Sequence, residues 1–244
     1  ESRTLTDMVW MWGQFIDHDI VATVGGNELF SIEIPEDDKL RQQNIHACED
    51  VDSPVHGQPD REDGVDTGGF EYNDTSAAAF TPDNHFVFTR SRGFADENGI
   101  RQHKNITTSF LDGSVVYGSD EKRASQLREF KTGRLKIDEN GLLPTIEGKK
   151  GMEYVAGDFR ASENPGLSSL QTLFVREHNR IADELHTENE QLTDEYIYQK
   201  ARVKVMGLLQ KITYDEFLPT LLGNDAIKEY KGYSEDINPG IFNE

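Results

Sequence analysis

Two polar side chains near the start of the chain, Gln14 and His18, have the types and the spacing that proton-transfer chemistry could use. In a helix, residues four positions apart point to the same side, so both could contact one bound molecule. Asp17 flanks that side, and Asp19 points away from it. A neutral histidine is the usual acid or base near neutral pH, whereas histidine with carboxylates can also bind a metal ion. A solvated helix end is the third interpretation.

The element that must position these groups is predicted to be a helix over residues 4–20. Its apolar residues recur at steps of three and four, which is the period of an amphipathic helix with one buried face. They are Leu5, Met8, Val9, Trp12, Phe15 and Ile16. A neutral polar group buried beside such a face costs roughly 2–7 kcal/mol unless it has a partner. We therefore expect the polar last turn to face a ligand, which disfavours the solvated interpretation.

A second set of oxygen-bearing residues lies in NITTSFLDGSVVYGS, residues 105–119. In an extended backbone alternate side chains share a face, which predicts one row of potential ligands. The row consists of Thr108, Phe110, Asp112 and Ser114. Three of them offer side-chain oxygens, and Phe110 offers its backbone carbonyl. Oxygen ligands of this kind suit a hard cation such as Ca²⁺, which takes about 6–8 of them, and Asp19 could supply a second carboxylate.

Two further charged residues, Arg160 and Glu163, precede a long predicted helix. Pro165 after Asn164 marks the start of that helix, and the apolar period that follows carries it to about residue 185. Arg160 and Glu163 should therefore lie in a non-helical turn, from which they can project into a cavity.

The remaining patterns predict more helices than strands. We expect helices over residues 120–130, capped by Ser119, and from Thr193 to about Ile212. A short strand is expected within 86–93, and a hairpin over 135–144 around Asn140-Gly141. Residues 24–85 are rich in Gly, Pro and acidic residues, which is typical of a solvated surface excursion; His46, Cys48 and His56 lie in it without partners at ligand spacing.

Composition bounds the class of protein. The 244 residues are 35% hydrophobic and 29% charged, which suits a globular body with a sizeable core. The net charge of −20 would repel nucleic acid and anionic membranes. There is no run of 18 apolar residues, so no spanning helix is expected, and the single cysteine excludes an intrachain disulfide. Both ends of the sequence resemble cuts within a longer chain.

Five stretches together, in this order, resemble the animal-type haem peroxidases of the peroxidase-cyclooxygenase superfamily. They are WGQFIDHD at 12–19, TSFLDGSVVYGS at 108–119, AGDFRASENP at 156–165, LFVREHNRIADEL at 173–185 and ITYDEFLP at 212–219. They span nearly the whole chain apart from 24–85. The resemblance implies that residues 1–244 are the N-terminal and central part of a single, mainly α haem peroxidase domain with long loops and little β structure.

The resemblance also implies roles for the first group of residues. His18 would be the distal histidine, which takes a proton from the attacking oxygen of hydrogen peroxide and returns it to the leaving oxygen. Arg160 would stabilise the charge that develops on the peroxide. Gln14 would position water or a halide, and Asp17 and Glu163 would form ester bonds to haem.

The resemblance assigns the second group to a calcium site, made of Asp19, Thr108, Phe110, Asp112 and Ser114. This assignment explains why one carboxylate points away from the catalytic histidine. The cation would hold the residue next to the catalytic base.

The sequence departs from the family in three respects. Asn164 stands where one mammalian member carries a methionine that links to haem, so at most two covalent links are expected. Disulfides common in animal members cannot form with Cys48 alone, which favours a bacterial or invertebrate-like relative. The proximal histidine motif lies beyond Glu244 in the family, and His178 belongs to a helix motif whose histidine is not the iron ligand. A truncated C-terminus is the expected explanation.

The implied activity is oxidation of a halide, thiocyanate or phenolic donor by hydrogen peroxide, in an extracellular or exported protein linked to oxidative stress. One alternative is a fatty-acid dioxygenase of the cyclooxygenase branch, which lacks the ester-forming pair Asp17 and Glu163. Another is a calcium-dependent matrix or adhesion module without turnover. Such a module has no physical need for His18, Gln14 and Arg160 together.

Overall fold

A computed structural model describes residues 5–26, 28–38, 79–80, 85–148 and 151–238 of the chain. The chain divides into two compact units, one made of Glu1–Ala22 with Thr107–Glu244 and the other of Thr23–Ile106. The predictions for His46, Cys48 and His56 lie outside the described residues. All of the predicted site residues belong to the first unit.

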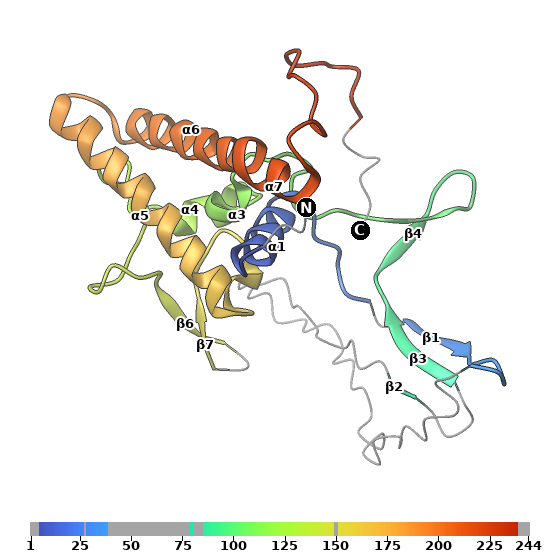
Figure 1. The fold of residues 1–244 in the computed structure, drawn as a ribbon. Helices are drawn as coiled ribbons and strands as arrows, with labels where there is room; N and C mark the ends of the chain where they lie inside the picture. The colour runs from blue at the N-terminus through green and yellow to red at the C-terminus, as the bar shows by residue number, and fades with distance from the viewer. Residues whose placement is uncertain (1–4, 27, 39–78, 81–84, 149–150, 239–244) are drawn as a thin grey trace. The chain divides into compact units, whose positions relative to one another are not determined.

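The first unit is helical, as the sequence predicts. Its elements are α1 (Met8–Ile20), α3 (Ser114–Tyr117), α4 (Glu121–Leu127), the 3₁₀ turn η1 (Phe159–Ser162), α5 (Pro165–Glu188), α6 (Asp194–Ile212), the π-helical turn η2 (Thr213–Phe217) and α7 (Leu218–Leu222). A small antiparallel hairpin pairs β6 (Thr145–Gly148) with β7 (Gly151–Tyr154). The long helices α5 and α6 lie side by side, and α1 packs against α3 and against α5 (Figure 1).

Local capping explains where the long helices begin. The side chain of Asn164 accepts a hydrogen bond from the Leu167 amide at 3.0 Å, and Pro165 follows in the first turn of α5. Thr193 caps α6 through the Tyr196 amide at 3.2 Å. The predicted boundaries of α5 and α6 are therefore confirmed to within a few residues.

Two predictions between residues 119 and 154 are wrong in detail. The cap of α4 is Asp120 rather than Ser119, and the helix ends at Leu127. The Asn140-Gly141 turn forms, but no strand pair flanks it, because the Asp138 carboxylate accepts from the amides of Asn140 and Leu142 and closes a local turn. The hairpin follows instead, as β6 and β7.

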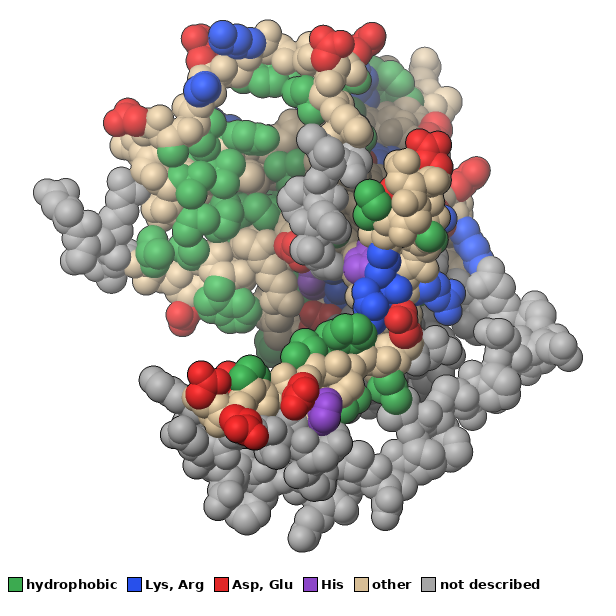
Figure 2. Space-filling view, turned by 90° about the vertical axis from the view of Figure 1, so that its right-hand side faces the viewer, with side chains coloured by type: hydrophobic (Ala, Val, Ile, Leu, Met, Phe, Trp, Pro, Cys, Tyr) green, Lys and Arg blue, Asp and Glu red, His purple; other side chains and the backbone are tan. Residues whose placement is uncertain are grey.

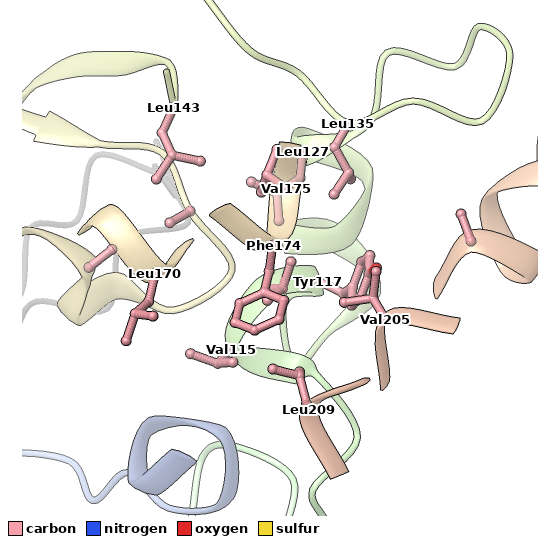
Figure 3. Close-up of a cluster of buried hydrophobic side chains, with 14 of the residues drawn as sticks. Val115, Tyr117, Leu127, Leu135, Leu143, Leu170, Phe174, Val175, Val205 and Leu209 are labelled. Atoms are coloured by element: carbon pink, nitrogen blue, oxygen red, sulfur yellow. The ribbon is translucent and has the colours of Figure 1, made fainter. Parts of the chain in front are cut away.

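The core of the first unit lies between α1, α3, α5 and α6, and Figure 3 shows part of it. On α1, Trp12 and Phe15 are buried, and the Phe15 ring stacks on Phe174 of α5 with centroids 5.5 Å apart. The predicted apolar face of α1 is shorter than expected, because Leu5 precedes the helix and Met8, in its first turn, is exposed. The buried half of the helix is the half that carries His18.

The second unit contains short antiparallel sheets. Strand β3 (His85–Arg90) lies between β1 (Glu28–Glu33) and β2 (Ala79–Phe80), and β4 (Gly93–Ala95) pairs with β5 (Arg101–His103). Every residue of β1 is exposed. Strands β1 and β2 lie within residues 24–85, for which only an irregular surface excursion was predicted. The strand near residue 86 was predicted.

Candidate functional site

The last turns of α1 hold Gln14 and His18 against the start of α5. The Gln14 side-chain amide donates to Oε2 of Glu163 at 3.1 Å, and Nε2 of His18 lies 4.0 Å from the same oxygen. Asn164 donates to the Gln14 carbonyl oxygen at 3.0 Å. These contacts join residues about 150 positions apart. The structure thus brings Gln14, His18 and Glu163 together, and Asp17 is half-buried on the same turn of α1.

Arg160 is held at the C-terminal end of α1 by a set of hydrogen bonds. Its Nη2 donates to the carbonyl oxygen of Val21 at 2.9 Å and to that of His18 at 3.4 Å. Its Nε donates to Oδ1 of Asp158 at 2.9 Å, and Nη2 also donates to Oδ2 of Asp158 at 3.0 Å. The guanidinium, which is buried, is therefore fixed by backbone carbonyls on one side and by a carboxylate on the other.

Burial keeps His18 neutral. The side chain is 4% exposed, and its pKa is lowered to about 4, first because burial penalises the charged form and then because the Arg160 cation is near; the Asp158 carboxylate opposes this. A neutral imidazole carries one lone pair that can accept a proton. Among the described residues no hydrogen-bond partner reaches the buried Nδ1 of His18. Within the same residues no group of three His, Cys, Asp or Glu side chains is placed to hold a metal ion.

The carboxylate of Asp19 points away from His18 into the bend before α3. Its Oδ1 accepts from the Val115 amide at 2.7 Å and from the Ser114 hydroxyl at 3.2 Å, and its Oδ2 accepts from the Gly113 amide at 3.0 Å. Asp19 is completely buried, and its pKa is raised to about 6, mainly by that burial, against the lowering effect of the two amide hydrogen bonds.

The other predicted oxygen ligands gather beside Asp19. The Thr108 hydroxyl oxygen lies 3.0 Å from Oδ1 of Asp112, 3.2 Å from the Phe110 carbonyl oxygen and 3.3 Å from the Ser114 hydroxyl. The Phe110 ring is exposed, so only its backbone oxygen faces the group. All five predicted residues therefore meet in one place.

The conformation of this segment differs from the extended row that the sequence predicted. Residue 107 and residues 109–113 form bends, and Ser114 is the first residue of α3. Gly113 has a φ of +76°, in the left-handed region that favours glycine, and this lets the chain turn into the helix. The oxygens converge because the backbone curls around them.

In the structure His178 has no ring nitrogen free to bind haem iron, because both of its nitrogens have hydrogen-bond partners. Its Nδ1 lies 2.9 Å from the hydroxyl oxygen of Tyr117, and its Nε2 lies 2.8 Å from the carbonyl oxygen of Gly133. Both ring nitrogens are thus engaged in the core, as expected for a structural histidine of α5.

Sequence reasoning missed Asp158. Its carboxylate accepts from the backbone amide and the side chain of Arg160, and Oδ1 lies 3.7 Å from Nδ1 of His18. The available signal was an aspartate two residues before an arginine at the start of a turn. In a sequence that pattern indicates a helix cap, and it says nothing about a histidine 140 positions away.

The family described as animal haem peroxidase matches residues 1–244. A peroxidasin homologue from Caenorhabditis elegans, pxn-2, is 34% identical over 270 residues, which cover 98% of this chain and 19% of that protein. The structure of Peroxidase A from Dictyostelium discoideum has a TM-score of 0.63 at 25% identity, covering 98% of this chain and 46% of that one.

A second kind of solved structure is also similar. The fatty acid alpha-dioxygenase of Oryza sativa has a TM-score of 0.59 at 26% identity and covers 88% of this chain and 28% of that one. The chain therefore spans less than half the length of each of these relatives.

Proposed function

Because the chain belongs to the animal haem peroxidase family, we propose that it supplies the distal half of a haem peroxidase site, which uses hydrogen peroxide to oxidise a small donor. The observation that carries the proposal is the neutral, buried His18 on the same helix end to which the guanidinium of Arg160 is hydrogen-bonded. A base and a fixed cation are the protein groups that assist heterolytic cleavage of an O–O bond, by moving the proton and by stabilising the developing negative charge.

His18 is assigned the proton transfers. Since its pKa of about 4 leaves the imidazole neutral at pH 7, its lone pair can take the proton of an incoming peroxide. The protonated ring can then return that proton to the departing oxygen. A histidine that was already charged could perform only the second step.

Arg160 is assigned the stabilisation of negative charge. Its Nη1 takes no part in the hydrogen bonds that Nε and Nη2 form, so those bonds can hold the guanidinium while Nη1 interacts with peroxide. Removing one such fixed donor from an enzyme site typically slows the reaction by about 10²–10³-fold. Gln14, tied to Glu163 and Asn164, is assigned the positioning of water or a halide.

Haem is the cofactor that the family implies, and the residues at the site fit it. Asp17 and Glu163 flank His18, and the Glu163 side chain is 34% exposed at the edge of the buried group, where a substituent of the macrocycle could reach it. We assign these two carboxylates the ester links. When bound, haem supplies the redox-active iron. Asn164, which stands where one mammalian member carries a haem-linking methionine, is assigned a structural role here: it caps α5 and contacts Gln14.

Calcium is proposed for the oxygen cluster around Asp19. Its ligands would be the side chains of Asp19, Thr108, Asp112 and Ser114 and the carbonyl oxygen of Phe110. The fit rests on the convergence of these oxygens and on the buried carboxylate, whose charge burial disfavours and a cation would offset. Because Asp19 follows His18 directly, a cation there would also restrain the catalytic base.

We propose an extracellular or exported location and a donor of the halide, thiocyanate or phenol type. The described residues include no helix long and apolar enough to cross a membrane. Acidic side chains recur on the face shown in Figure 2, in keeping with the net charge of −20 that disfavours nucleic acid as a partner.

The likeness to the Oryza sativa enzyme supports fatty-acid dioxygenation as the second candidate. The two functions differ in their oxidant, so the haem-loaded full-length protein should be assayed both for bromide or guaiacol oxidation with added peroxide and for oxygen uptake with palmitate. Peroxide-dependent oxidation without oxygen uptake supports the proposal. Oxygen uptake that needs the fatty acid would replace it by the second candidate, and failure of the full-length protein to bind haem would favour a non-catalytic calcium-binding module.

A further inference from the structure

Asp158 lies between the two groups to which the proposed function assigns chemistry. Its side chain is almost completely buried, and Oδ1 lies 2.9 Å from Nε of Arg160 and 3.7 Å from Nδ1 of His18. We propose that Asp158 is a positioning residue, which fixes the guanidinium of Arg160 and selects the tautomer of His18. This inference rests on the proposed function and goes beyond it.

The proposal is better supported for Arg160, which forms three hydrogen bonds with Asp158, than for His18. Three donors of that residue, the backbone amide, Nε and Nη2, reach the carboxylate at 2.9, 2.9 and 3.0 Å. A carboxylate that receives both Nε and a terminal nitrogen restricts rotation of the planar guanidinium. Arg160 thereby keeps Nη2 on the carbonyls of Val21 and His18, and its charge stays beside the imidazole.

The effect on His18 follows from which ring nitrogen faces which oxygen. Nδ1 faces Oδ1 of Asp158, and within the described part of the chain this buried nitrogen has no hydrogen-bond partner. A nearby carboxylate favours a proton on the nitrogen that faces it. The Glu163 carboxylate lies 4.0 Å from Nε2, but its side chain is 34% exposed and its Oε2 already accepts from Gln14, so the nearer and more deeply buried Asp158 has the stronger effect. The neutral ring then carries its hydrogen on Nδ1, and the lone pair of Nε2 remains available as the base. A small approach of the two groups would make a full hydrogen bond.

The backbone of Asp158 ties this arrangement to the proposed calcium site. Its amide donates to the carbonyl oxygen of Val115 at 3.0 Å, and the amide of Val115 donates to Oδ1 of Asp19 at 2.7 Å. One residue of α3 therefore connects the carboxylate that orients Arg160 with the carboxylate of the oxygen cluster. The backbone of Asp158 and the carboxylate of Asp19 are thus both bonded to a short helix that packs against α1.

The first test is a nuclear magnetic resonance measurement on the unsubstituted, haem-free chain with labelled histidine and arginine. We expect His18 to carry its proton on Nδ1, and the Nε–H of Arg160 to exchange slowly with solvent. A His18 ring protonated on Nε2, or rapid exchange of the Arg160 Nε–H, would overturn the proposal. This measurement needs neither haem nor a substitution that could unfold the protein.

The second test substitutes Asp158→Asn, which preserves the shape and removes the charge. In the haem-loaded protein we expect the second-order rate constant with peroxide to fall roughly 10²-fold, as when a fixed donor is lost, with an unchanged KM for the electron donor. In an Arg160→Lys background the same substitution should have a much smaller effect, because the guanidinium that Asp158 orients is absent.

A matched control comes from Asp194, another carboxylate that pairs with a buried arginine. It accepts from Nη2 of Arg128 at 2.6 Å and from the Gly133 amide at 2.6 Å, away from His18. Asp194→Asn should lower stability without changing the peroxide rate constant. Equal rate losses in both variants, or none in Asp158→Asn, would reduce Asp158 to a structural role. If the unsubstituted, haem-loaded full-length protein does not react with peroxide, the proposed function fails, and the first test alone decides how Asp158 acts on the two side chains.

Discussion

Replacing Asp19 by asparagine should abolish the response of the protein to calcium and should destabilise the calcium-free protein by at most about 1–3 kcal/mol. The carboxylate accepts from two backbone amides and one hydroxyl. Asparagine keeps one of the two oxygens and places an NH₂ group where the other was, so one buried donor loses its acceptor. That loss costs about 1–3 kcal/mol. Removal of a buried charge, whose pKa burial raises to about 6, offsets part of it.

The calcium-dependent stabilisation is measured separately from this cost, because each protein is compared with itself in the presence and absence of calcium. A ligand at 100 times its Kd stabilises the folded state by about 2.7 kcal/mol. For a chain of this size each kcal/mol corresponds to roughly 2–4 °C in Tm, so the unsubstituted protein should gain roughly 5–11 °C. The variant lacks one of two carboxylates in the group and should gain almost nothing.

Thermal unfolding of both proteins, in chelator and across a calcium titration, measures this difference. Asp138→Asn is the matched control, because Asp138 also accepts from two amides but lies in a separate turn; it should keep the full calcium shift. If the unsubstituted protein melted at the same temperature with and without calcium, the assignment of the oxygen cluster to a cation would be refuted.

Three further predictions concern the frame around the site. Phe174→Ala should destabilise by about 3–5 kcal/mol, since the ring is buried and stacks on Phe15, whereas Leu173→Ala on the exposed side of α5 should stay within about 0.5 kcal/mol; urea unfolding distinguishes them. Asn164→Ala should cost about 1 kcal/mol through loss of the α5 cap, and a helix start that melts no earlier by hydrogen exchange would contradict that assignment. His178 has a pKa lowered to about 4 by burial, so between the unfolded value of 6.5 and about 4 the unfolded chain binds more protons; its contribution to stability is complete above pH 6.5 and is lost as pH falls towards 4. His18, whose pKa is also lowered to about 4, acts in the same direction, and Asp19, whose pKa is raised to about 6, acts against both. Urea midpoints measured from pH 7 to pH 4.5 should therefore decline by a smaller amount in a His178→Asn variant than in the unsubstituted protein, and an equal decline in both would be inconsistent with a neutral, buried His178.

The elements of the helical unit could be predicted because their signals are local. Asn164 with Pro165, and Thr193 with the apolar residues after it, mark helix starts through contacts within a few residues. The pairing of β1 with β3 joins residues more than 50 positions apart, such as Glu28 and Arg90. Nothing in the local pattern of either segment indicates that partner.

In the candidate site, too, local features could be predicted from the sequence and long-range contacts could not. That Gln14 and His18 share a helix face follows from their spacing; in the structure Gln14 is hydrogen-bonded to Oε2 of Glu163, and Nε2 of His18 lies 4.0 Å from the same oxygen. That Arg160 lies at the end of this helix, 142 positions from His18, was expected only from the family resemblance. Asp158 was missed because its role depends on that long-range meeting, and the oxygen cluster was found although its backbone conformation was predicted wrongly.

The most direct test of the central claim is the rate at which the haem-loaded full-length protein reacts with hydrogen peroxide after His18→Ala, followed by the change in the Soret band. If His18 is the base, the rate constant should fall by roughly 10²–10⁴-fold while haem stays bound. A rate constant equal to that of the unsubstituted protein would contradict the assignment of proton transfer to this imidazole.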